Sequence, residues 1–135
     1  MATTATATAM TQTTHLTLTC HCGRISVRIP SKPTDLNECR CTVCYKYGAL
    51  WAYYPRGDVV VTASDKAAAV PYVRTDTGAG AQGSIEFMRC SVCGCVTHWL
   101  GLGEQYTRPT SNMGVNARML PEGEIEGMNR EVSYC

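Results

Sequence analysis

The chain carries three short cysteine clusters: Cys20-His-Cys22-Gly23, Cys39-Arg-Cys41-Thr-Val-Cys44 and Cys90-Ser-Val-Cys93-Gly94-Cys95. They contain eight of its nine cysteines. Cysteines one to three positions apart on short loops are poorly placed to bridge one another, but they can direct several sulfurs at one tetrahedral ion. Zinc prefers thiolate ligands at about 2.3 Å. The clusters therefore predict a zinc-binding protein.

A disulfide framework is the competing interpretation of a small cysteine-rich chain. It would require an oxidising compartment, and the N-terminus lacks the basic and apolar regions of a secretory signal. Nine cysteines is also an odd number, which leaves one thiol unpaired. Metal binding is the better interpretation, and we expect the isolated Cys135 to be inert.

Length and charge narrow the class of protein further. The 135 residues suffice for one domain, and the net charge of +1 gives no electrostatic reason to expect nucleic acid or a membrane surface as partner. No apolar run is long enough to span a bilayer, and we expect a cytoplasmic protein. We predict a disordered Ala/Thr-rich tail over 1–13, a zinc-binding domain over 14–122 and a C-terminal tail over 123–135.

Residue patterns predict a mainly β fold of short strands. Alternation of apolar and polar side chains, or short apolar runs between Gly and Pro, predicts strands at 15–19, 24–29, 49–54, 59–62, 70–74, 84–89, 96–100 and within 112–120. Pro71 makes the strand at 70–74 an expected edge strand. One helical turn is expected at 43–47 before Gly48, a flexible loop at 76–83 and a further loop at 101–111.

The order of these clusters resembles the glutathione-dependent formaldehyde-activating enzyme family, which also includes centromere protein V. The likeness runs from about Thr19 to Leu120 and includes Gly23, Gly48 and the closing strand from Val115 to Arg118. It implies short coiled antiparallel sheets around zinc sites, an arrangement called a β-tent. It also implies condensation of formaldehyde with glutathione, the reverse of a carbon–sulfur lyase reaction.

The resemblance further implies two zinc ions per chain and their ligands. A structural site would use Cys20, Cys22, Cys90 and Cys93, and a second site would use Cys39, Cys41 and Cys44. Four thiolates leave zinc no vacant position, whereas three leave one for water or a thiol. Zinc at the three-cysteine site would favour an activated thiolate, so these three cysteines are the expected catalytic centre. Cys95 is an alternative fourth ligand that would close this site.

Other polar residues have weaker claims to a role. His21 lies between two ligands and is expected to be exposed, while His98 is either a packed strand residue or a proton shuttle. Arg40 and Lys46 flank the middle cluster, where they would relieve its negative charge or hold a substrate carboxylate. Arg118 would pair with an acidic neighbour or act in the site. The aromatic residues Trp51, Tyr53, Tyr54 and Trp99 are expected in the core and the cleft wall.

These observations predict a zinc-dependent carbon–sulfur lyase-type enzyme acting on a thiol adduct of formaldehyde or another small carbonyl compound. Its partner would be a small-molecule substrate, with glutathione as one candidate. One alternative is a tailoring enzyme or cyclase of secondary metabolism that uses the same zinc pocket. Another is a non-catalytic zinc-stabilised binding module, because family membership does not fix function.

Overall fold

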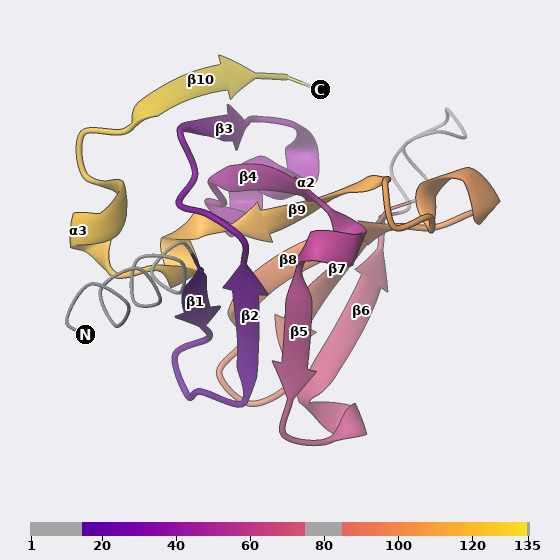
Figure 1. Cartoon of the computed structure of the whole chain (residues 1–135). Coiled ribbons are helices and arrows are strands. Elements are labelled where there is room, and N and C mark those ends of the chain that lie inside the picture. The colour runs from indigo at the N-terminus through magenta and orange to yellow at the C-terminus, as the bar shows by residue number, and fades with distance from the viewer. Residues whose placement is uncertain (1–14, 75–84, 135) are drawn as a thin grey trace, which may run out of the picture.

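The computed structural model describes residues 15–74 and 85–134, which form two sheets and short helices (Figure 1). The smaller sheet has the order β1 (Leu16–Thr19), β2 (Ile25–Ile29) and β5 (Val60–Ala63). The larger sheet has the order β10 (Asn129–Ser133), β3 (Asp35–Cys39), β4 (Trp51–Pro55), β9 (Asn112–Asn116), β8 (Val96–Gly101), β7 (Ile85–Cys90) and β6 (Ala69–Val73). All paired neighbours are antiparallel except β10 and β3, which are parallel. The prediction of a mainly β fold is confirmed.

Short helical segments occupy the connections between strands. The α-helices are α2 (Thr42–Tyr47) and α3 (Glu122–Ile125). Single 3₁₀ turns are η1 (Arg56–Asp58), η2 (Lys66–Ala68), η4 (Glu104–Tyr106) and η5 (Ala117–Met119). Gly48 ends α2 in the left-handed conformation at φ +66°, as its place after the helical turn predicted.

The two sheets share a hydrophobic core. Ile25, Val27 and Ile29 alternate along β2 and are at most 1% exposed, so one face of this strand is fully buried. They pack with residues of the larger sheet and its connections, including Leu36 and Val115. A second, smaller cluster surrounds Trp51 and Phe87 and includes Cys39 and Cys44. The middle cysteines therefore sit against a core of their own.

The strands expected from apolar patterns are present, but two strands were missed. The segments 35–39 and 121–135 carry few alternating apolar residues, yet the first forms β3 and the second contains β10. These two strands pair in register from Asn129 with Asp35 to Ser133 with Cys39. Backbone hydrogen bonding, rather than a buried side-chain face, defines β10, so periodicity gives no signal for it. The strand β6 is at an edge of its sheet, as Pro71 predicted.

Some expectations concern residues outside the described part of the chain. These are the tail at 1–13, the loop at 76–83 and the terminal Cys135. The predicted domain boundaries remain predictions.

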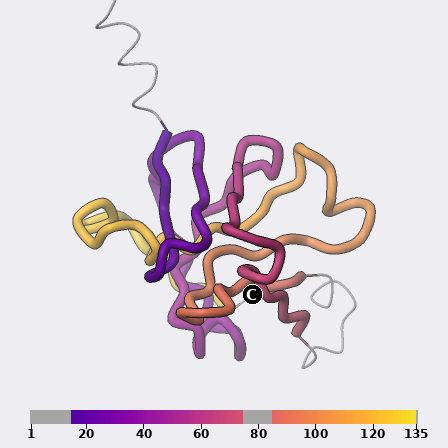
Figure 2. The backbone as a smooth tube through the Cα atoms, turned by 90° about the horizontal axis from the view of Figure 1, so that it is seen from below, coloured from indigo at the N-terminus to yellow at the C-terminus, as the bar shows by residue number. Residues whose placement is uncertain are grey.

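The fold brings two distant loops together. The tip between β1 and β2 carries Cys20 and Cys22, while Cys90 ends β7 and Cys93 lies in the turn that follows it. Gly23 and Gly94 adopt φ of +83° and +80°, which lets each chain turn sharply between its cysteines and the next strand. The segment between β8 and β9 projects on the side of the domain opposite the β1–β2 hairpin (Figure 2). This segment forms part of the cavity described below.

A buried amide joins β4, β8 and β9 near the middle cluster. Asn116 is 3% exposed. Its Oδ1 accepts from the backbone N–H of Leu50 at 3.2 Å and of Arg118 at 3.2 Å, and its Nδ2 donates to the carbonyl oxygen of Val96 at 2.8 Å. One side chain therefore satisfies three backbone groups around which the strands converge.

Replacing this amide should destabilise the fold. Asn116→Ala leaves buried backbone groups unpaired, and we expect the free energy of unfolding to fall by roughly 2–4 kcal/mol, measured by urea titration. The control is Asn129→Ala, which removes an exposed bond to Asp35 and should cost about 0.5 kcal/mol or less. Equal, small effects of both substitutions would contradict this role for Asn116.

Candidate metal centres and the adjoining cavity

The first candidate metal centre joins the two loop tips. The Sγ atoms of Cys20, Cys22, Cys90 and Cys93 all lie within 4.8 Å of one another. Cys22 Sγ is 3.8 Å from Cys20 Sγ and 3.5 Å from Cys90 Sγ. Zinc–sulfur bonds of about 2.3 Å place tetrahedral sulfurs about 3.8 Å apart. The spacing and the all-thiol donor set therefore fit a tetrahedral zinc.

Backbone N–H groups surround these sulfurs. Ile25 N donates to Cys20 Sγ at 3.3 Å, and the N atoms of Val92 and Cys93 lie 3.4 and 3.5 Å from Cys90 Sγ. Donors of this kind stabilise thiolates. Burial alone acts in the other direction, and it raises the pKa of the Cys20 thiol to about 11 despite the Ile25 N–H. The loops therefore supply donors where four negative sulfurs would meet.

Cys95 lies beside this first group. Its hydrogen-bonding partners are the backbone N–H of His21 and the side chain of Cys93. It packs on the main core, whereas Cys39 and Cys44 belong to the smaller one. Cys95 is in neither group of sulfurs close enough to share an ion. The structure thus directs it away from the middle cluster.

The second candidate metal centre has three described sulfurs. Cys39 ends β3, Cys41 is the N-cap of α2, and Cys44 lies one turn later on that helix. Their Sγ atoms are within 4.8 Å of one another. Cys44 N is 3.5 Å from Cys41 Sγ, so the cap that starts the helix also orients the pair. At the other end of α2, Arg118 Nε donates to the carbonyl oxygen of Gly48 at 2.7 Å.

Two side chains donate to sulfurs of this middle group. Trp51 Nε1 is 3.3 Å from Cys44 Sγ. Arg74 Nη1 is 3.6 Å from Cys41 Sγ, and its Nη2 is 3.2 Å from Thr42 Oγ1. Burial raises the pKa of the Cys44 thiol to about 12, and the indole N–H opposes this effect. Cys39 is disulfide-bonded in this structure. With its thiol reduced, three thiolates on a divalent ion would leave one negative charge, which the Arg74 guanidinium would offset.

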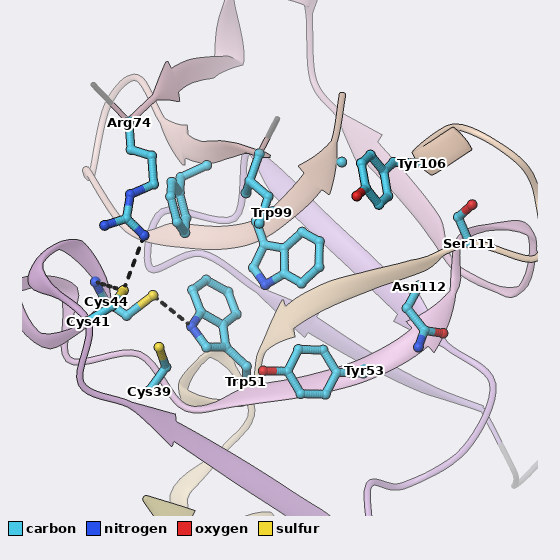
Figure 3. Close-up of a pocket in the computed structure, with 13 residues that line it drawn as sticks. Cys39, Cys41, Cys44, Trp51, Tyr53, Arg74, Trp99, Tyr106, Ser111 and Asn112 are labelled. Carbon is cyan, nitrogen blue, oxygen red and sulfur yellow. Dashed lines mark hydrogen bonds between the residues drawn. The ribbon is translucent and has the colours of Figure 1, made fainter. Parts of the chain in front are cut away.

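A cavity of about 490 Å³ opens directly onto the middle group (Figure 3). All three cysteines line it, together with Trp51, Tyr53, Arg74, Ile85, Phe87, Trp99, Gly101, Tyr106, Ser111 and Asn112. Its size lies in the range of about 300–1,000 Å³ typical of small-molecule sites. The four-cysteine group does not contribute to its lining. The two centres therefore differ in access as well as in ligand number.

The other predicted site residues lie elsewhere. Arg40 forms an ion pair with Glu38 at 2.7 Å, and Lys46 and His21 are exposed. None of the three lines the cavity. His98 is 2% exposed, its Nδ1 lies 2.8 Å from Thr97 Oγ1, and it does not line the cavity either. Burial lowers the pKa of His98 to about 4, so its imidazole is neutral near pH 7.

Sequence reasoning did not single out seven residues of the cavity lining, among them its cation and three polar residues. Arg74 follows an edge strand, and Tyr106, Ser111 and Asn112 belong to or border the segment predicted as a loop. No motif or spacing links them to the cysteines, because the sheet order alone brings them there. Trp51, Tyr53 and Trp99 do line the cavity, whereas Tyr54 is 7% exposed and donates to the carbonyl oxygen of Ser31 at 2.8 Å.

Comparison with known proteins agrees with this architecture. The model of the family described as glutathione-dependent formaldehyde-activating enzyme matches residues 15–124. The chain belongs to this family. No curated protein matches it at the level required for significance. A crystal structure of a Rhodobacter sphaeroides protein shares the fold with a TM-score of 0.63 at 20% identity, covering 86% of this chain and 100% of that one.

The family match supports an enzyme-like role connected with formaldehyde and glutathione, and the two cysteine groups can hold metal ions. Within the described part of the chain, no helix has the length and apolar character needed to cross a membrane.

Cys90 and Cys95 provide a matched test of the first centre. Cys90→Ser removes a buried sulfur of the four-membered group, so we expect loss of its metal and insoluble or non-cooperatively melting protein. Cys95→Ser alters the same loop outside the group and should retain metal content and melting behaviour. Elemental analysis and circular dichroism measure both. A soluble Cys90→Ser protein with unchanged metal content and a cooperative melt would contradict the assignment.

The two centres should also differ in lability. The middle group has three described sulfurs and opens onto a cavity, so a mild chelator should remove its metal first while the fold survives. Timed chelation with a colorimetric metal indicator, followed by circular dichroism, gives the order of release and of unfolding. Simultaneous release of all metal, or none before unfolding, would show that the centres are not distinct in this way.

Proposed function

We propose that the chain is a zinc-dependent carbon–sulfur lyase-type enzyme whose catalytic centre is Cys39, Cys41 and Cys44. Its reaction would join a thiol to formaldehyde or another small carbonyl compound, or cleave the adduct. The observation that carries the proposal is the opening of the three-sulfur group onto the cavity. We assign a structural role to the metal that the first centre (Cys20, Cys22, Cys90 and Cys93) would hold.

The donor set of the middle group fits this chemistry. A zinc ion held there would keep an incoming thiol deprotonated near neutral pH. The thiol sulfur then forms a bond to the carbonyl carbon, and the carbonyl oxygen takes up the proton that the thiol released. Cleavage of the hemithioacetal reverses both changes. No oxidant or reductant is needed in either direction.

The residues around the cysteines would bind substrate and adjust charge. Trp51 and Arg74 donate to the sulfurs of Cys44 and Cys41, which reduces electron density on those ligands. The apolar and aromatic lining limits water near the carbonyl carbon, and this disfavours competing hydration of the aldehyde. These residues hold and shield the reactants. His98 has no place in this scheme because it lies outside the cavity.

The cavity also supports a related alternative, a tailoring enzyme or cyclase that acts on a larger substrate. Its volume of about 490 Å³ exceeds what a one-carbon aldehyde requires. A purely non-catalytic binding module accounts less well for an aromatic cavity beside a three-sulfur group. Glutathione remains a candidate thiol through the family, and a cytoplasmic location remains a prediction from the sequence.

Exchange spectroscopy tests the reaction directly. With formaldehyde and glutathione at equilibrium, NMR measures the rate at which they interconvert with S-hydroxymethylglutathione. We expect zinc-loaded protein to accelerate the exchange and Cys95→Ser to retain this acceleration. Cys44→Ser should lower the accelerated exchange rate at least tenfold, because it removes one of the three sulfurs of the middle group. No acceleration for any aldehyde, with glutathione or with a small thiol, by protein verified to contain zinc, would overturn the proposed function.

A further inference from the structure

The cavity beside the middle cysteines is walled by aromatic rings. Trp51 and Phe87 have ring centroids 6.0 Å apart, and Tyr53 and Trp99 have centroids 6.1 Å apart. Tyr53 and Tyr106 remain 44% and 37% exposed. Large aromatic side chains left accessible in a concave site are typical of ligand-binding surfaces.

Two glycines allow these rings to lie close against the sheet. A Cβ atom on Gly114 would lie 1.9 Å from Trp99 Nε1, so any side chain there would displace the indole. A Cβ atom on Gly101 would lie 2.5 Å from Tyr106 Cβ. Arg56 strengthens the second contact, because its Nη1 donates to the carbonyl oxygens of both Gly101 and Tyr106. Each ring can therefore take its position only because the residue beside it is a glycine.

The polar groups of the lining suit glutathione poorly. Among the described residues that line the cavity, Arg74 is the one cation, and there is no carboxylate. Arg74 already donates to Cys41 and Thr42. Glutathione carries two carboxylates and an ammonium group, and burying such charges without partners is unfavourable. Formaldehyde, in turn, would leave most of the volume unfilled.

We infer that the cavity selects a flat aromatic aldehyde, which it binds for addition of a small thiol at the middle cysteines. The inference rests on the proposed function and names its carbonyl substrate class. The aromatic ring would pack against Trp99 and Tyr106, with the carbonyl carbon toward the cysteines, which line the cavity on the side away from Tyr106 (Figure 3). Sulfur bonds to that carbon, and the thiol proton passes to the carbonyl oxygen. Ser111 and Asn112 lie at the end of the cavity away from the cysteines, where a polar ring substituent would meet them.

Binding and catalysis are tested separately on zinc-loaded protein. Isothermal titration calorimetry with 2-naphthylmethanol, an unreactive analogue, reports binding, with 1-propanol as the aliphatic control. Exchange NMR with 2-mercaptoethanol compares 2-naphthaldehyde with formaldehyde. We expect the naphthyl alcohol to bind at least tenfold more tightly than propanol. The ratio of exchange rates with and without protein should be at least tenfold larger for naphthaldehyde than for formaldehyde.

Matched variants locate the binding site. Gly114→Ala should weaken naphthyl binding at least tenfold, whereas Gly123→Ala, where a Cβ meets nothing within 4 Å, should not change it. Tyr106→Ala removes a partly exposed ring and covers the case in which Gly114→Ala fails to fold. Its control is Tyr45→Ala, which removes a ring that is 70% exposed and outside the cavity.

The outcomes distinguish this inference from the proposed function. Acceleration of formaldehyde exchange without preferential naphthyl binding would overturn the aromatic substrate class and leave the lyase-type function in place. Tight naphthyl binding that Gly114→Ala or Tyr106→Ala weakens, with no acceleration for any aldehyde, would support the ligand class and overturn the function. Naphthyl binding insensitive to both substitutions would also overturn the inference, because the ligand would then lie elsewhere.

Discussion

The meeting of two loop tips at one group of sulfurs is the constraint on which this domain depends. Cys22 and Cys90 are 68 residues apart, yet their sulfurs lie 3.5 Å from each other. The first tip belongs to the smaller sheet and the second to the larger, so this contact fixes the sheets relative to one another. For a chain of this size, an ion at that junction would supply stability that a modest core provides only in part.

The middle group depends on the same arrangement in a different way. Its cysteines come from a single stretch of chain, where β3 ends and α2 begins. Its surroundings, however, come from β4, β7, β8, the start of β9, the connection before it, and Arg74 just after β6. The local sequence therefore creates the ligand set, and the seven-stranded sheet creates the cavity. This division lets related proteins keep one chemistry while changing the compounds on which it acts.

The predictability of each part follows from how local its cause is. Cysteine spacing identifies the three clusters, and alternation identifies β2, because these signals lie within a few residues. The pairing of the first cluster with the third was implied by the family resemblance. The strand β10 has almost no buried side chains, so the sequence offers no period to detect. Arg74 reaches Cys41 across 33 residues of chain, and Cys95 lies with His21 of the distant first loop. Neither can be inferred without the tertiary structure.

The parallel pairing of β10 with β3 connects the end of the chain to the middle cysteines. Arg40 N donates to the carbonyl oxygen of Ser133 at 2.6 Å, and the register aligns Ser133 with Cys39. This edge strand therefore holds in place the segment that delivers two of the three sulfurs. The last strand therefore couples the end of the described chain to the position of the candidate metal centre.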